Sequence, residues 1–244
     1  MCRLLGIVGK RAVPVSECLT TAKRSLSVLS REHPDGWGIA LHSRSAEGWR
    51  VHRSTERAHA CGEFRRVAEE GAAEVVVAHV RQKTVGHTSI DNTHPFTRGR
   101  WVFAHNGTVR RIDVLEGRSS RRRLGEIRGD TDTERLFAYF LTRLDEAGLT
   151  DEPASPATDH VVAEATRELR ECEELGAWNY LLSDGKVLYA HRFGRTMCVL
   201  ARHDAVLVAS EPITDEPWTD VPEGSLMRVE QSDAPHVVHL PRTP

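Results

Sequence analysis

A series of four short segments in the last third of the chain constrains the fold more than any other feature. The segments are rich in apolar and β-branched residues, and they cover 178–182, 187–190, 197–201 and 205–209. They are separated only by short breaks at Asp184-Gly185, around Gly194 and at His203-Asp204. Breaks this short are typical of antiparallel hairpins, whereas a βαβ crossover needs a dozen or more residues. The sequence therefore predicts an α+β fold with substantial antiparallel sheet.

Similar apolar segments, alternating with helical patterns, precede this series. The same signals predict further strands over 4–8, 37–42, 75–80 and 101–104. Apolar residues at helical spacing predict helices within 19–29, 136–144 and 161–172. Strands are therefore expected to outnumber helices.

Two segments carry mainly loop-forming or charged residues. The first, 148–159, contains two prolines and many small or acidic residues, so it is either an interdomain linker or a surface loop between two helices. The second, 110–128, contains seven arginines and few aromatic residues. We interpret it as a mobile solvated loop, with acceptor binding or nucleic-acid binding as the alternative.

Composition excludes several classes of protein. The 244 residues are 39% hydrophobic and 28% charged, with a formal net charge of -2, so no global field favours nucleic acid. No stretch approaches the roughly 18 apolar residues of a membrane helix. The first ten residues lack the apolar region and cleavage site of a secretory signal. We therefore expect a cytoplasmic protein that binds neither nucleic acid nor membrane.

Cysteine and histidine spacing gives no sign of a metal site. The five cysteines are widely spaced and include no C-x-x-C pair, so most are expected to be buried thiols. The 13 histidines include no H-E-x-x-H pattern. We therefore predict neither a bound metal nor a cofactor.

Cys2 is a candidate nucleophile. Removal of a methionine that precedes a small residue would leave Cys2 with both a thiol and a free α-amino group. The amine titrates at about 7.7 to 8.0 and the thiol at about 8.5, so the amine can accept the thiol proton near neutral pH. The alternative is a small apolar residue at the entrance of the first strand.

The sequence His105-Asn106-Gly107 follows a predicted strand. Asn-Gly is a strong hairpin signal, because both residues tolerate positive φ. The functional alternative is an oxyanion hole, in which the Asn106 amide and the Gly107 backbone N–H stabilise a tetrahedral intermediate.

Two further charged residues stand at the ends of predicted elements. Arg81 follows the strand at 75–80, and its planar guanidinium suits a carboxylate ligand, although a surface ion pair is the alternative. Asp132 lies between Thr131 and Glu134, which have the spacing of a capping box at a helix start. The capping box does not require Asp132.

Taken in order along the chain, these motifs closely resemble those of the type-2 glutamine amidotransferases. The motifs are Cys2-Arg3-Leu4-Leu5-Gly6, Asp35-Gly36-Trp37-Gly38, Ala78-His79-Val80-Arg81, Asn92-Thr93-His94-Pro95-Phe96, His105-Asn106-Gly107 and Thr131-Asp132-Thr133-Glu134. The resemblance continues through 178–185 and 209–212, so it spans nearly the whole chain.

The resemblance implies an N-terminal-nucleophile (Ntn) hydrolase fold. We therefore expect a four-layer αββα sandwich of two stacked, mainly antiparallel sheets, formed by a single domain over 2–244 after Met1 is removed. In such an enzyme Cys2 would attack the γ-amide of glutamine or of a γ-glutamyl conjugate. Asn106 and Gly107 would form the oxyanion hole, and water would hydrolyse the thioester after ammonia or an amine leaves.

The resemblance also assigns substrate-binding roles. Arg81 corresponds to the residue that binds the substrate α-carboxylate, and Asp132 to the one that holds the α-ammonium group. Thr84 and His94 correspond to supporting residues of the pocket. Val85 departs from the family pattern, in which a histidine often follows the threonine.

Three biochemical roles remain open at this point. The protein could be a glutaminase that feeds ammonia to a separate synthase or acceptor-binding subunit, or a stand-alone amidase that trims γ-glutamyl conjugates. The third alternative is a non-catalytic regulatory or binding subunit that retains the pocket. The presence of all five principal site residues argues against this third role.

Overall fold

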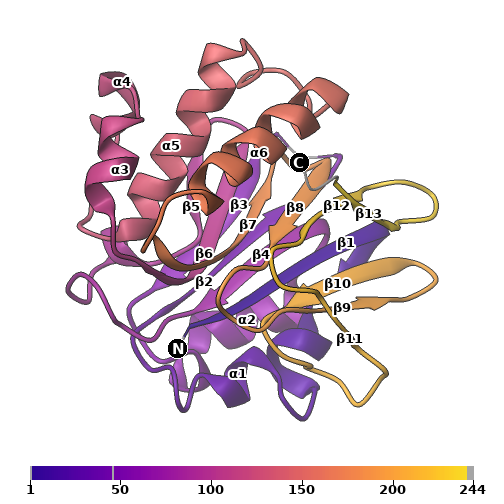
Figure 1. The fold of residues 1–244 in the computed structure, drawn as a ribbon. Helices are drawn as coiled ribbons and strands as arrows, with labels where there is room; N and C mark the ends of the chain where they lie inside the picture. Colours follow the sequence, from indigo (N-terminus) through magenta and orange to yellow (C-terminus); the bar gives the residue numbers. More distant parts are fainter. Residues whose placement is uncertain (1, 46, 241–244) are drawn as a thin grey trace.

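The computed structural model describes residues 2–45 and 47–240, and it contains two stacked sheets with helices on both outer faces (Figure 1). The layers are thus helix, sheet, sheet, helix. The predicted four-layer sandwich is confirmed. Met1, and with it the expected removal of this residue, lies outside the described residues.

The first sheet has seven strands in the order β11-β9-β10-β1-β4-β2-β3. Every pair in it is antiparallel. The strands are β1 (Arg3–Pro14), β2 (Trp37–His42), β3 (Trp49–Ser54), β4 (Ala72–Val80), β9 (Cys198–Ala201), β10 (Ala205–Ala209) and β11 (Thr219–Asp220). β1, which begins one residue after Cys2, pairs with both β4 and β10 near the middle of this sheet.

The second sheet has six strands in the order β13-β12-β8-β7-β6-β5, again with antiparallel pairs. The strands are β5 (Phe96–Arg98), β6 (Trp101–Val109), β7 (Gly176–Ser183), β8 (Val187–His191), β12 (Leu226–Glu230) and β13 (Val237–His239). Its strands β6 and β8 lie against the first sheet, β6 over β1 and β4 and β8 over β1.

Alternation along the strands divides the core into three layers. In β1, Leu4 and Val8 point into the space between the sheets, while Leu5 and Ile7 pack under the helices of the first sheet. Gly6 also faces the second sheet, because a Cβ at this position would lie 2.6 Å from Cδ2 of Leu188. The absence of a side chain therefore allows the two sheets to approach closely.

Helices cover the two outer faces. The first sheet is covered by α1 (Leu26–Leu29), α2 (Gly62–Glu70) and a π-helical turn at Glu17–Thr21. The second is covered by α3 (Ile112–Gly117), α5 (Asp132–Glu146) and α6 (Pro156–Arg170), with α4 (Arg121–Leu124) against α5. Short 3-10 turns lie at Ala58–Ala60 and Ile90–Asn92. No helix in the described ranges is long and apolar enough to cross a membrane.

The predicted strands all occur, but one of the predicted hairpins is wrong. The turns at Asp184-Gly185 and His203-Asp204 do join the antiparallel pairs β7–β8 and β9–β10. Around Gly194 the chain instead passes from the second sheet to the first, since β8 and β9 belong to different sheets. A short glycine-containing break therefore does not distinguish a hairpin from a crossing between stacked sheets.

The helix predictions are confirmed at α5 and α6 and wrong over 19–29. That stretch forms two separate turns, because Ala22 is extended and the Ser25 side chain accepts a hydrogen bond from Val28 N to begin α1. Within 148–159, the residues before Pro156 form a loop between α5 and α6, which pack against each other, and 156–159 already belong to the first turn of α6.

The interpretation of 110–128 as a mobile solvated loop is also wrong. The segment contains α3 and α4, and the Arg123 side chain is only 5% exposed. Arg123 binds Asp145 of α5 through two hydrogen bonds of 2.7 Å, and it also contacts Glu126. An arginine in the basic run thus fastens α4 to α5.

This geometry predicts that Arg123→Ala lowers the free energy of unfolding by about 2 to 3 kcal/mol, because it removes a largely buried cation and leaves Asp145 without it. Arg122→Ala is the matched control, since Arg122 is 72% exposed and its removal should cost less than about 0.5 kcal/mol. Urea denaturation measures both values. Equal effects of the two substitutions would contradict the structural role of Arg123.

Candidate active site

Cys2 lies where β1 meets the end of β4. Its Sγ donates to the backbone carbonyl of Gln82 at 3.2 Å, and Gln82 N–H donates to Sγ at 3.3 Å. The side chain of Arg3 next to it binds Glu211 at 2.5 Å, and Leu4 N–H donates to Ser210 Oγ at 2.7 Å. The first residues of the chain are therefore held on both sides.

The environment of the thiol favours its protonated form. Burial raises the pKa of Cys2, and it outweighs the Gln82 N–H and the Arg81 charge, both of which lower that pKa; the Asp132 charge raises it further. A nucleophilic thiolate at this position therefore needs a base that takes the proton as the thiol reacts.

Arg81 is a buried cation next to Cys2 in the fold. The residue is 3% exposed, and its guanidinium donates to the backbone carbonyls of Val85 at 3.0 Å and His87 at 3.3 Å. Within the described residues it makes no ion pair. Burial lowers the pKa of Arg81, although the Cys2, Asp35, Asp130 and Asp132 charges oppose that shift. The alternative of a surface ion pair is therefore wrong.

Asp132 begins α5 and is 6% exposed. Its Oδ2 accepts a hydrogen bond of 2.7 Å from Val109 N at the end of β6. The capping box is only half formed: Thr131 Oγ1 accepts from Glu134 N, but the Glu134 carboxylate accepts from the backbone N–H groups of Arg128 and Gly129. The first turn of α5 is therefore tied to both β6 and the segment before the helix.

Asn106 and Gly107 lie inside β6, so the hairpin alternative is wrong. Gly107 has φ of 147°, and a Cβ there would lie 2.0 Å from the carbonyl oxygen of Ala177 on the paired strand β7. Only glycine fits this position. Asn106 is 2% exposed, and its Oδ1 makes no hydrogen bond within the described residues.

Thr84 connects the segment after Arg81 to the end of β6. Thr108 Oγ1 donates to Thr84 Oγ1 across a long distance of 3.4 Å. Thr108 follows Gly107 in the chain, and Gln82, which binds Cys2, lies two residues before Thr84. The contact therefore places the Cys2 and Gly107 segments on adjoining elements. No hydrogen bond in the described structure joins Asn106 directly to Cys2.

His94 belongs to a group of buried histidines rather than to the contacts around Cys2. Its ring centroid is 4.3 Å from that of His79, and it also packs on Phe96. Burial lowers the pKa of both histidines well below the ordinary value, and it lowers the pKa of nearby His33 to about 4. These rings are therefore neutral at pH 7.

Sequence reasoning gave no role to several residues that position the site. Gln82 binds Cys2 only through its backbone, so no side-chain signal could identify it. Asn92 is fully buried and donates from Nδ2 to the carbonyl of His87 and to Asp130. His105 Nδ1 lies 3.0 Å from Thr133 Oγ1, which links β6 to α5. Asn92, His105 and Thr133 each lie within one of the ordered motifs, and this position was the available sequence signal for their role.

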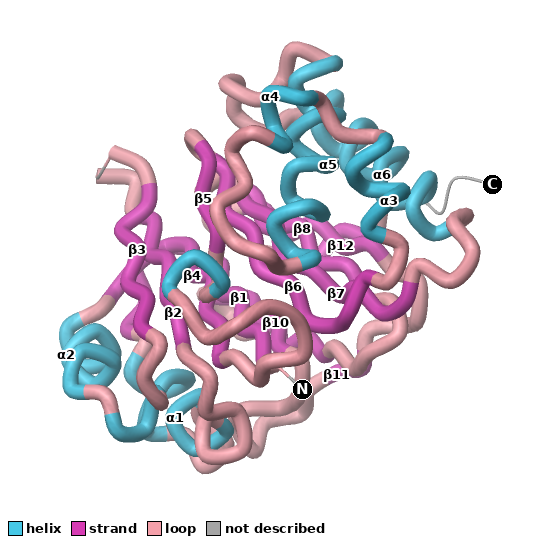
Figure 2. Tube along the Cα trace, turned by 90° about the vertical axis from the view of Figure 1, so that its left-hand side faces the viewer, coloured by secondary structure: helices cyan, strands magenta, loops and turns pink. Residues whose placement is uncertain are grey.

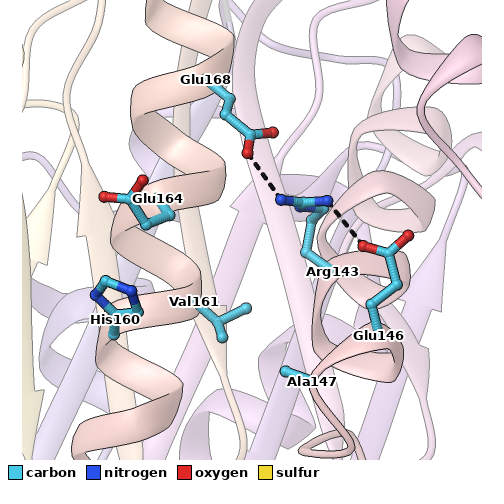
Figure 3. A pocket seen from close by; sticks show the side chains of 7 residues that line it. All are labelled: Arg143, Glu146, Ala147, His160, Val161, Glu164 and Glu168. Carbon is cyan, nitrogen blue, oxygen red and sulfur yellow. Dashed lines mark hydrogen bonds and ion pairs between the residues drawn. The ribbon is translucent and has the colours of Figure 1, made fainter.

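Elsewhere, a hollow of about 300 Å³ lies between α5 and α6 on the outer face of the molecule (Figure 3). Arg143 stands between Glu146 and Glu168, at 2.8 Å and 2.7 Å, so its charge is neutralised. None of the predicted site residues lines this hollow. Among the described residues, no group of His, Cys, Asp and Glu has metal-binding geometry.

Comparison with known proteins identifies the family. The family model for class-II glutamine amidotransferases matches residues 1–205. The chain belongs to this family, and it is therefore an enzyme of the glutamine amidotransferase class with the Ntn-hydrolase fold.

Three similar proteins illustrate the relationship. The γ-glutamyl-hercynylcysteine sulfoxide hydrolase of Mycobacterium tuberculosis H37Rv is 30% identical over 243 residues, which cover 95% of this chain and 94% of that protein. YafJ of Escherichia coli K12, named as a glutamine amidotransferase, is 32% identical over 199 residues, 78% of this chain and 72% of that protein. The glutamine phosphoribosylpyrophosphate amidotransferase of B. subtilis has a TM-score of 0.66 at 17% identity, covering 98% of this chain and 49% of that chain.

The neutral buried histidines predict a loss of stability in acid. His33 has its pKa lowered to about 4, whereas the unfolded chain binds a proton at about 6.5, so its contribution is complete above pH 6.5 and is lost as the pH falls toward 4. His33→Gln should remove up to about 1.4 kcal/mol per pH unit from the slope of unfolding free energy in that window. Urea titrations between pH 4.5 and 7.5 test this; parallel profiles for both proteins would refute it.

Proposed function

We propose that the protein hydrolyses the γ-amide bond of glutamine or of a γ-glutamyl conjugate through a thioester on Cys2. The observation that carries the proposal is Arg81, a buried guanidinium beside the Cys2 segment with no ion-pair partner among the described residues. A buried arginine that lacks a carboxylate is costly unless a ligand supplies one. The α-carboxylate of a γ-glutamyl substrate meets that requirement.

Asp132 supplies the opposite charge. Its Oδ2 is fixed by Val109 N–H, and its other oxygen can accept a hydrogen bond from a substrate ammonium group. Arg81 and Asp132 act on each other and on Cys2 electrostatically. Together they favour a free amino-acid head, in which a carboxylate and an ammonium group share one carbon.

The reaction uses the Cys2 α-amine that is freed when Met1 is removed. The amine takes the thiol proton as Sγ bonds to the γ-carbonyl carbon, and the resulting oxyanion lies between Asn106 Nδ2 and Gly107 N–H. The carbon–nitrogen bond then breaks, and the leaving ammonia or amine takes a proton from the α-ammonium of Cys2. Water attacks the thioester, which releases glutamate and regenerates the thiol. Thr84, beside the Gly107 segment, and His94, within the group of buried histidines, have supporting roles in this proposal.

The match to the M. tuberculosis hydrolase over nearly the full length of both proteins favours a γ-glutamyl conjugate as substrate. Such a conjugate has a bulky amine as its leaving group. The similarity to YafJ, named as a glutamine amidotransferase, favours glutamine as substrate. In that case the released ammonia would pass to a separate synthase. The two alternatives differ only in the group bound beyond the γ-amide nitrogen.

The first prediction from this proposal concerns Cys2. The Met1-processed protein should release glutamate from glutamine or from a member of a panel of γ-glutamyl amides and peptides, and Cys2→Ala should reduce turnover to less than about 0.1%. Mass spectrometry establishes Met1 removal, and Cys18→Ala is the control thiol variant. Glutamate release by Cys2→Ala above a few per cent would remove Cys2 as nucleophile. No release by the processed wild type from any member would favour a regulatory subunit.

The second prediction tests Arg81 and Asp132 with substrate analogues that lack the α-carboxylate or the α-ammonium group. Arg81→Gln should lower kcat/KM for glutamine by about 100-fold, because a charge-assisted bidentate contact is lost. It should have little further effect on 4-aminobutanamide, which lacks the α-carboxylate.

Asp132→Asn should likewise affect glutamine far more than glutaric acid monoamide, which lacks the ammonium group. Equal losses on full and truncated substrates would indicate that the residue has only a structural role.

A further inference from the structure

A larger hollow, of about 600 Å³, lies away from Cys2. Its lining consists of Arg53, Thr97, Arg98, Gly99, Gly125, Glu126 and Arg128. These residues come from β3, from β5 and the turn after it, and from the segment that follows α4; the three elements can be followed in Figure 2. A volume of this size accommodates a small molecule rather than a single ion.

One of the three arginines is already neutralised. Arg98 Nη2 is 3.1 Å from Glu134 Oε1, and its Nε is 3.7 Å from Glu126 Oε2. The same Nη2 donates to the backbone carbonyl of Glu126 at 2.5 Å. The Arg98 side chain is therefore held in place at the wall of the hollow, and the carboxylates of Glu126 and Glu134 neutralise its charge.

The other two arginines have no such partners. Arg53 is partly buried, and its Nη1 donates to the carbonyl of Thr93 at 3.0 Å. Burial lowers the pKa of Arg53, while Asp91 and Glu134 oppose this only at long range. Arg128 is exposed. Across the described ranges, neither Arg53 nor Arg128 forms an ion pair, in contrast to Arg143 in the hollow of Figure 3.

We propose that Arg53 and Arg128 bind a small molecule bearing a phosphate or carboxylate group in this hollow. A guanidinium presents two parallel N–H donors that match either anion, and two arginines can bind one phosphate or carboxylate group from different sides. The neutralised Arg98 leaves these two charges available to the ligand. This inference does not depend on the reaction proposed above.

The hollow borders the segment that leads to Asp132. Glu134, which binds Arg98, also accepts from the backbone N–H groups of Arg128 and Gly129. A ligand held by Arg128 would therefore rest on the same segment that positions the start of α5. Neither Cys2 nor Arg81 lines this hollow.

Isothermal titration calorimetry of the full protein tests the proposal, with inorganic phosphate and citrate as probes against chloride at equal ionic strength. We expect saturable binding of at least one probe, weakened at least 10-fold by Arg128→Gln and by Arg53→Gln. Arg65→Gln, an exposed arginine on α2, is the matched control and should bind as the wild type does. Binding of phosphate alone would indicate a ligand that bears a phosphate group, and binding of citrate alone would indicate a ligand that bears a carboxylate group.

Arg81→Gln separates this site from the candidate glutamine pocket, and it should leave probe binding unchanged. Arg128 is exposed, so Arg128→Gln should keep the wild-type melting temperature in chloride and remain informative even if Arg53→Gln fails to fold. The proposal is overturned if neither probe binds saturably, if Arg128→Gln binds as the wild type does, or if only Arg81→Gln loses binding.

Discussion

The arrangement of the site depends on the antiparallel ladders that hold β1 between β4 and β10. In the register, Arg3 is opposite Val80 of β4 and Leu5 is opposite Ala209 of β10. Cys2 therefore sits at the end of a strand that cannot shift without breaking two ladders. The contacts of Arg3 with Glu211 and of Leu4 with Ser210 fasten the same end. The candidate nucleophile Cys2 depends on this restraint, because chain termini are otherwise poorly ordered.

Electrostatics around Cys2 follow from burial. His79 and His94 lose their charge because burial lowers their pKa, so the buried rings add no positive charge to the site at neutral pH. Arg81 retains its charge under the same conditions, since an arginine titrates far above neutral pH. The Arg81 cation is held by the carbonyls of Val85 and His87, and the neutral rings would not compete with it for the substrate carboxylate that we propose it binds.

Sequence signals predicted what local chemistry determines. Apolar and β-branched segments predicted eight of the strands, helical spacing predicted α5 and α6, and the ordered motifs assigned Cys2 and Arg81 to one candidate site; in the structure the two residues lie at adjoining strand ends. Signals failed where the answer depends on distant residues. Arg123 is buried by Asp145, 22 residues away, so its basic neighbours gave no indication of its role. Asn106-Gly107 carries a turn signal, yet its glycine serves close packing on Ala177 within a strand.

The partial capping box at α5 shows how fold and site are coupled. A complete box would direct Glu134 back to the Thr131 backbone. Here Glu134 binds the N–H groups of Arg128 and Gly129 and the guanidinium of Arg98 from β5, so the segment before the helix is anchored to the edge of the second sheet. Asp132 then reaches Val109 at the end of β6, the strand that carries Asn106 and Gly107. The orientation of α5 thus fixes the distance between a carboxylate and the candidate oxyanion hole. Asp132 and Glu134 lie in the same first turn of α5, so a shift of Arg98 or Arg128 would also displace Asp132.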